Sequence, residues 1–164
     1  MALEIRRAHP DELDAVGRLT VHAYVAGGVI PPDAAYLAFL GDAGHRDTAA
    51  ELWVSTDERG VVGTVTFVEP GSPLCEIAGD GEAEMRSLAV VPTASGEGIG
   101  EALARHVVER AREQHLRAMV LSSSTTMHAA HRLYGRLGFT RLPERDWSPV
   151  QGVQLVAYIL PLHD

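Results

Sequence analysis

Residues 84–113 read EMRSLAVVPTASGEGIGEALARHVVERARE, and the fold of the chain is organised around this stretch. Residues 84–91 mix apolar and polar side chains as a strand does, and Pro92 ends the strand because proline has no N–H to give to a neighbouring strand. A glycine-rich turn at residues 95–100 then opens a long, unbroken helix. Glycines let backbone N–H groups approach a ligand, and the first turn of a helix offers free donors and the positive end of its dipole. The stretch therefore predicts a cradle for a phosphate or a pyrophosphate.

Two other kinds of phosphate-binding loop are excluded by the spacing of these residues. A dinucleotide-binding loop requires G-x-G-x-x-G and an acidic residue about twenty positions later, after a second strand. Here Gly96, Gly98 and Gly100 give G-x-G-x-G, and the next strand candidate, residues 118–122, ends in serines. A Walker loop requires Gly-Lys followed by Ser or Thr, and the stretch contains no lysine.

The letters LAVVPTASGEGIGEAL resemble the acetyl-CoA motif of the GNAT (Gcn5-related) N-acetyltransferases. That motif is a strand ending in Val, then Pro, then Arg/Gln-x-x-Gly-x-Gly/Ala at the start of a helix. The matching residues are Val90, Pro92, Gly98 and Gly100. A second family motif, A-x-x-x-Tyr followed by Gly-Phe, is met by Ala130, Tyr134, Gly138 and Phe139. Two motifs in the correct order are far more specific than one glycine loop, and the resemblance covers most of the chain.

The resemblance implies an N-acetyltransferase that uses acetyl-CoA as cosubstrate and moves its acetyl group to a primary amine directly, in a ternary complex. Tyr134 matches the tyrosine that lies near the CoA sulfur and protonates the departing thiolate, and a backbone N–H near Val90 matches the donor to the thioester carbonyl. The residues that the resemblance assigns to the cofactor are Leu88, Ala89, Val90, Ser95, Gly96, Glu97, Gly98, Ile99, Gly100, Met127, Ala130 and Tyr134.

Two positions depart from the family pattern. Ser95 stands where the family has Arg or Gln, which removes a long donor to the pyrophosphate. Met127 stands where an asparagine often begins the second motif, which removes an amide contact near the cofactor. Backbone amides do most of the cradling, so the interpretation stands without either contact.

The residue that removes the proton from the amine is less well defined. Glu84 resembles the position of a glutamate base in some family members. Glu82 and Arg86 share its face if residues 84–91 are extended, because alternate residues of a strand point the same way. A neighbouring arginine lowers the pKa of a carboxylate and weakens it as a base. The sequence therefore leaves Glu84 as a direct base, a member of a water relay or a salt-bridged structural residue.

The remaining segments predict an α+β fold in one domain, residues 1–164, with a mixed, mostly antiparallel sheet flanked by helices. Residues 84–91 and 118–122 form its one parallel pair, joined by the long helix and splayed at the cofactor site. The expected strands are residues 3–7, 52–56, 61–68, 84–91 and 118–122, with one more at the end of the chain. The expected helices are residues 10–20, 34–40 with Asp33 as N-cap, 98–114 and 127–137, with a weaker helical turn at 47–50.

Composition limits the partners. The net charge of −8 argues against nucleic acid and favours a cationic amine as acceptor. No apolar run is long enough to cross a membrane, the first residues lack the apolar core of a signal peptide, and Cys75 has no partner for a disulfide, which together predict a cytoplasmic protein. His128 and His131 lie on one helical turn without a third ligand at metal-site spacing, so no metal is expected.

The acceptor is not identified by any motif. It is expected to be a small-molecule amine or a peptide N-terminus, selected by residues 21–40 and 69–83, and a homodimer is left open. The main rival interpretation is a non-catalytic acyl-CoA-binding module or sensor. The retained Tyr134 distinguishes the two, because a sensor has no need of an acid for a thiolate.

Overall fold

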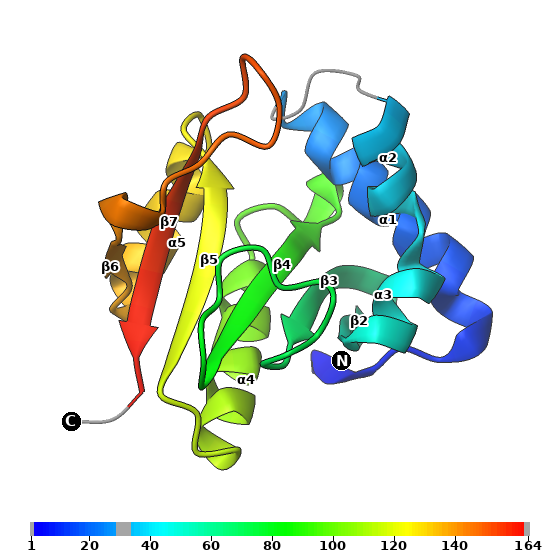
Figure 1. The fold of residues 1–164 in the computed structure, drawn as a ribbon. Helices are drawn as coiled ribbons and strands as arrows, with labels where there is room; N and C mark the ends of the chain where they lie inside the picture. The colour runs from blue at the N-terminus through cyan, green and yellow to red at the C-terminus, as the bar shows by residue number, and fades with distance from the viewer. Residues whose placement is uncertain (1, 29–33, 163–164) are drawn as a thin grey trace.

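Seven strands form one sheet in the computed structural model, which describes residues 2–28 and 34–162 (Figure 1). The order across the sheet is β1-β2-β3-β4-β5-β7-β6. The strands are β1 (Glu4–Arg7), β2 (Glu51–Asp57), β3 (Gly60–Val68), β4 (Glu82–Val90), β5 (Ala118–Ser124), β6 (Thr140–Arg141) and β7 (Leu155–Pro161). Every neighbouring pair is antiparallel except β4 with β5. The predicted α+β class, with one parallel pair, is confirmed.

Helices cover both faces of this sheet (Figure 1). They are α1 (Leu13–Ala26), α2 (Ala34–Gly41), α3 (Ala43–Ala49), α4 (Ile99–Glu113) and α5 (His128–Leu137). The alternation of side chains along β2 separates the two layers. Leu52 and Val54 pack with Val16 of α1 and with α3, whereas Trp53 between them packs on α4, with its ring 4.3 Å from that of His106. We call the face covered by α1–α3 the front and the face covered by α4 and α5 the back.

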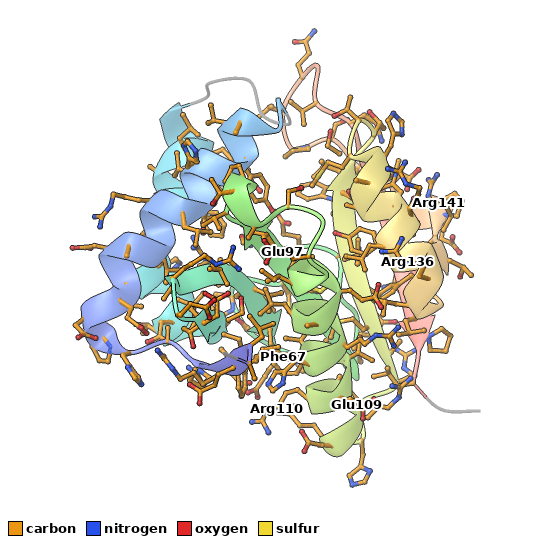
Figure 2. The ribbon with its side chains drawn as sticks, turned by 180° about the vertical axis from the view of Figure 1, so that it is seen from behind. Phe67, Glu97, Glu109, Arg110, Arg136 and Arg141 are labelled. Carbon is orange, nitrogen blue, oxygen red and sulfur yellow. The ribbon has the colours of Figure 1, made fainter. Side chains whose placement is uncertain are left out.

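The back layer holds the larger core, and α4 is its centre. The predicted apolar stripe of this helix is buried over its whole length: Ile99, Leu103, Val107 and Ala111. They pack against the back-facing residues of the central strands, among them the fully buried Phe67, which Figure 2 shows beneath α4. The opposite side of α4 carries charged, exposed residues, as the sequence predicts.

Several elements are longer than the sequence indicates. Helix α1 runs to Ala26 rather than to residue 20, and the N–H of Gly27 bonds to Ala23 to close it. The weak turn at 47–50 is part of α3, which begins earlier because the Asp42 carboxylate caps it by accepting the N–H of His45 at 3.0 Å. Strand β4 starts at Glu82 because it pairs there with β5. The expected N-cap Asp33 lies outside the described residues.

The parallel pairing of β4 with β5 is short. It joins Glu82 to Ala118, Ala83 to Met119 and Glu84 to Val120, and no later residues of these strands are paired with each other in the described sheet. Each strand keeps its other neighbour: β4 pairs with β3 as far as Val90, and β5 pairs with β7 as far as Ser124. The two strands therefore diverge at the point where the sequence predicts the cofactor.

Glycine allows α1 to approach the end of α2 closely, and this contact can be tested. A Cβ at Gly17 would lie 2.1 Å from the carbonyl oxygen of Gly41, which is backbone and cannot rotate away. We expect Gly17→Ala to lower the free energy of unfolding by about 1–3 kcal/mol through overpacking. Urea denaturation followed by circular dichroism measures the change.

The matched control is Gly135→Ala in α5, where an added Cβ meets no atom of the described residues within 4 Å. This variant should gain about 0.5–1 kcal/mol from the higher helix propensity of alanine. A Gly17→Ala protein as stable as the control variant would contradict the close packing of α1 on α2.

Candidate active site

The turn before α4 has the geometry that an anion cradle requires. Gly96 and Gly98 have φ angles of 83° and 82°, in the left-handed region that side chains rarely adopt. A Cβ at either position would meet no atom of residues 2–28 and 34–162 within 4 Å, so both backbones are open toward a ligand in the described part of the chain. Gly98 is the N-cap of α4, and the first amides of the helix follow it. An anion can therefore approach these N–H groups directly.

A pocket of about 610 Å³ extends from this cradle along α5. Its walls come from the end of α1, the end of β4, the turn after it, the start of α4 and one side of α5. Seven of the residues assigned from sequence line it: Val90, Ser95, Gly96, Gly98, Ile99, Gly100 and Ala130. The wall formed by Ala23, Ala26 and Gly27 was missed, because the sequence analysis ended the first helix at residue 20.

Five of the assigned cofactor residues do not line this pocket. Leu88 and Ala89 lie on β4 beyond its last pair with β5. The Met127 sulfur turns toward Ser123, whose hydroxyl lies 3.6 Å away. The other two, Glu97 and Tyr134, are held by neighbours that are described below.

The backbone of β4 faces the divergence of the two strands. Successive N–H groups of a strand point to opposite sides, and the N–H of Val91 bonds to the carbonyl of Val62 on the β3 side. The N–H of Val90 is therefore directed toward β5, where the described sheet pairs no β5 residue with it. This is the position that the sequence predicts for a donor to the thioester carbonyl.

A bulge in β4 precedes this donor. The register between β3 and β4 shifts between Thr64 and Thr66, and Ser87 opposite has a φ of 55°. A positive φ is strained in a serine, and its buried hydroxyl has no hydrogen-bond partner in the part of the chain that the structure describes. Bulges bend a strand, and this one turns the end of β4 away from β5. No signal in the sequence marked it.

Tyr134 lies in an aromatic cluster behind the sheet. Its side chain is 5% exposed, and its ring centroid lies 5.8 Å from that of Phe139 and 5.7 Å from that of Tyr158. Burial is the main cause that raises the pKa of the phenol well above its usual value, and the nearby Tyr158 raises it further. The hydroxyl is therefore protonated at neutral pH and can act as a donor.

A second buried tyrosine, Tyr24, lies on α1. Burial, with Tyr36 and Tyr134 nearby, raises its pKa as well.

Glu84 is fully buried and supports the loop before β4. Its Oε1 accepts N–H bonds of 2.9–3.0 Å from three successive residues, Glu76, Ile77 and Ala78. Its Oε2 is buried and has no partner in residues 2–28 and 34–162. Oε1 of Glu84 thus holds the loop, whereas Oε2 has lone pairs that accept no hydrogen bond from the described residues.

The two neighbours of Glu84 on the front of β4 hold the same loop. Glu82 accepts the N–H of Gly79 at 2.7 Å and pairs with Arg145 at 2.6 Å. Arg86 donates to the carbonyl of Leu74 at 3.0 Å and pairs with Glu76 at 3.2 Å. Arg86 therefore shares the face of Glu84, as expected, but its ion pair is with Glu76. The three side chains together fix residues 74–79 over the front of the sheet.

Carboxylates beside the cradle are tied to arginines. Glu97 points away from the turn and meets Arg59 of the β2–β3 hairpin at 2.7 and 3.1 Å. Glu101, in the first turn of α4, pairs with Arg105 at 3.0 Å and with Arg136 of α5 at 3.1 Å. Figure 2 shows Glu97 at the start of α4 and Arg136 on α5. These contacts lower the pKa of both carboxyls, so both are ionised and neutralised locally.

No group of three or more His, Cys, Asp or Glu side chains in the described residues is placed to hold a metal ion. His128 and His131 have ring centroids 6.0 Å apart, and His131 contacts Ser123 and the carbonyl of Ser124. Across residues 2–28 and 34–162, every helix is too short or too polar to cross a membrane.

Comparison with known proteins agrees with this geometry. The sequence model of the acetyltransferase (GNAT) family matches residues 15–139. N-acetylaspartate synthetase from Danio rerio is 33% identical over 108 residues, which are 66% of this chain and 36% of that protein. N-acetyltransferase 8B from Rattus norvegicus is 34% identical over 114 residues, 67% of this chain and 50% of that protein. The chain thus spans half or less of the length of these relatives.

Solved structures share the fold over the whole chain. A Gcn5-related N-acetyltransferase from Kribbella flavida is 25% identical, has a TM-score of 0.72 and covers 98% of both chains. A putative acetyltransferase from Salmonella typhimurium, solved with its cofactor acetyl-CoA, is 22% identical, with a TM-score of 0.72 over 100% of this chain and 96% of that one.

The structural task of Glu84 can be separated from its charge. Glu84→Ala removes the acceptor of three backbone N–H groups, so we expect it to lower the free energy of unfolding by about 1–3 kcal/mol. Glu84→Gln keeps an acceptor oxygen of the same reach and should lose less. Urea denaturation of the two variants measures the difference, and equal losses would mean that the charge, not the hydrogen bonds, supports the loop.

Proposed function

The chain belongs to the GNAT acetyltransferase family, and from this premise we propose that it is an N-acetyltransferase that transfers the acetyl group of acetyl-CoA to a primary amine. The observation that carries the proposal is the early end of the β4–β5 pairing beside a glycine cradle. Strand divergence exposes backbone donors, and the cradle at its mouth suits a pyrophosphate. The relatives named N-acetylaspartate synthetase and N-acetyltransferase 8B support the reaction class.

The residues of the pocket fit acetyl-CoA. Gly96 and Gly98 leave open the space that a Cβ would occupy, and small residues, Ala23, Ala26 and Ala130, line the pocket beyond them. A narrow chain with a diphosphate at one end matches such a pocket. The similar Salmonella typhimurium structure holds acetyl-CoA, which supports this assignment. Acetyl-CoA supplies the activated acetyl thioester.

The protein supplies three groups for a direct transfer. The N–H of Val90 stabilises negative charge on the carbonyl oxygen as the amine attacks. The phenol of Tyr134 gives its proton to the departing thiolate, and burial, which raises the pKa of the phenol, keeps that proton in place until the thiolate forms. The amine and the acetyl group are held together by the walls of the site, which replaces a bimolecular encounter.

Glu84 is the proposed proton acceptor, acting through its Oε2. This oxygen is buried and without a partner among the described residues, whereas Oε1 is occupied by the loop. Glu84→Gln keeps the loop contacts and loses this acceptor, so unchanged turnover of that variant would remove Glu84 from the mechanism.

The acceptor is a small-molecule amine or a peptide N-terminus. Its proposed side of the site is the front of β4, where Glu84, Glu82 and Arg86 hold residues 74–79. The anchored loop gives a fixed wall for selection. A homodimer and a cytoplasmic location remain predictions from the sequence.

The alternative is an acyl-CoA-binding module without transfer. It would keep the cradle and the pocket but would not depend on the phenol of Tyr134. The two functions therefore differ in the turnover of the wild type, which the second test below measures beside that of the variant.

The first test is ligand binding. Acetyl-CoA at 100 times its dissociation constant should stabilise the protein by about 2.7 kcal/mol by linkage, which raises the melting temperature. NAD at the same concentration should have no comparable effect, because the glycine spacing does not suit a dinucleotide. Thermal shift assays measure both, and stabilisation by NAD without stabilisation by acetyl-CoA would refute the proposal.

The second test is Tyr134→Phe. Only the hydroxyl is lost, so acetyl-CoA should bind as to the wild type, while turnover falls by about 100- to 10,000-fold. Because the pKa of Tyr134 is raised, the wild type should show no loss of activity from its ionisation up to about pH 10. Single-turnover kinetics measures the chemical step. Unchanged rates would remove Tyr134 from the mechanism, whereas a wild type that binds acetyl-CoA without any turnover would favour the binding module.

A further inference from the structure

The cations of this chain are few and of one kind. The chain has 14 Lys and Arg residues in total, and every one of them is an arginine. The turn at residues 95–100 contributes none, since its first position is the short, exposed Ser95. A dianionic pyrophosphate at this turn would meet backbone amides but no positively charged side chain from the turn itself. A cation must therefore come from elsewhere in the fold.

The pocket beside the turn contains one candidate. Among the described residues that line it, Arg136 is the one arginine. It lies on α5 (Figure 2), and its Nε donates to Glu101 in the first turn of α4 at 3.1 Å. Its side chain is 59% exposed, so it can change partner without loss of packing. Arg136 and the amides of the cradle thus border the same space.

The balance of charge at Glu101 leaves Arg136 in surplus. Glu101 has two guanidinium partners, Arg105 on its Oε2 and Arg136 on its Oε1. If Arg136 turns to a phosphate, Arg105 still neutralises the carboxylate. Without Arg105, the negative charge of Glu101 would be left facing an anionic ligand.

Arg59, on the other side of the turn, has no such surplus. It is shared by two carboxylates, Asp57 at 2.6 Å and Glu97 at 2.7 Å. Moving Arg59 to a phosphate would release Glu97, a member of the turn, next to the anion. Its contacts therefore suit a fixed role, which is to hold Glu97 away from the cradle.

We propose that Arg136, held ready by Glu101, is the cation that binds the pyrophosphate of CoA in this chain and replaces the long side chain absent at Ser95. This inference rests on the proposed use of acetyl-CoA. A guanidinium on a phosphate forms charge-assisted hydrogen bonds, which are stronger than neutral ones. The amides of the turn and Arg136 then hold the diphosphate from two sides.

The test is the affinity of Arg136→Gln for CoA, measured by calorimetric titration at low salt. We expect the dissociation constant to rise about tenfold, the size of one charge-assisted contact. Dephospho-CoA, which keeps the pyrophosphate and lacks the 3′-phosphate, should show the same rise. Pantetheine, which has no phosphate, should bind both proteins equally. The difference between the proteins should shrink as salt rises, because the site is open to solvent.

Arg105→Gln is the matched control. Arg105 has the same partner and the same 59% exposure as Arg136, but it does not line the pocket. Arg105→Gln should lose much less CoA affinity than Arg136→Gln, because it removes no phosphate contact and leaves only the solvent-screened charge of Glu101 unneutralised. An equal loss in both variants would overturn the inference, because the effect would then come from the charge around Glu101. Unchanged CoA binding by Arg136→Gln would also overturn it.

A second arm uses Ser95→Arg. Added to Arg136→Gln, it should restore CoA affinity, and in the wild-type background it should add little, because one site is already filled. Equal gains in the two backgrounds would show that the arginines do not share a phosphate and would refute the replacement. If the wild-type protein binds neither CoA nor acetyl-CoA, the proposed function itself is refuted. If the wild type binds CoA but Arg136→Gln binds it equally well, only the role of Arg136 is refuted.

Discussion

The short hydrogen-bonded contact between β4 and β5 is the constraint on which the rest of the site depends. The two strands pair over Glu82–Ala118, Ala83–Met119 and Glu84–Val120, and then each follows its antiparallel neighbour instead. Because β4 remains hydrogen-bonded to β3 and β5 remains hydrogen-bonded to β7, each strand is held in place where the two are no longer paired with each other. Beyond these pairs, the described sheet pairs no residue of β4 with β5, and exposed strand edges of this kind bind extended ligands readily.

The divergence is built into β4 by local features on both of its faces. The strained φ of Ser87 and the register shift opposite it bend the strand just before Val90. On the front, Glu82, Glu84 and Arg86 are each occupied by the preceding loop. On the back, the strand rests on α4, whose first turn carries the cradle. The strand therefore connects the acceptor side, the site of transfer and the phosphate site as one rigid unit.

Local charge, rather than the net charge of the protein, governs the cradle. A chain with a net charge of −8 repels phosphates at long range, but screening limits that effect to about 10 Å at ordinary ionic strength. Beside the turn, Glu97 pairs with Arg59, which Asp57 shares, and Glu101 pairs with two arginines. The helix dipole and the amides act over a few ångströms and are not cancelled.

Elements with local signals could be predicted from the sequence. The turn at residues 95–100, the buried stripe of α4 and the cap at Gly138 follow from glycine geometry and helical periodicity, and the turn predicted the cradle. The fold class followed from the order of the expected strands and helices and from the family resemblance. Which side chains meet depends on tertiary packing. The bulge at Ser87, the wall formed by the end of α1, the loop held by Glu84 and the pairing of Arg136 with Glu101 join residues that lie far apart in the chain or depend on a neighbouring strand. Such contacts leave no periodic pattern, because the packing of the sheet, and not the spacing of residues along the chain, brings them together.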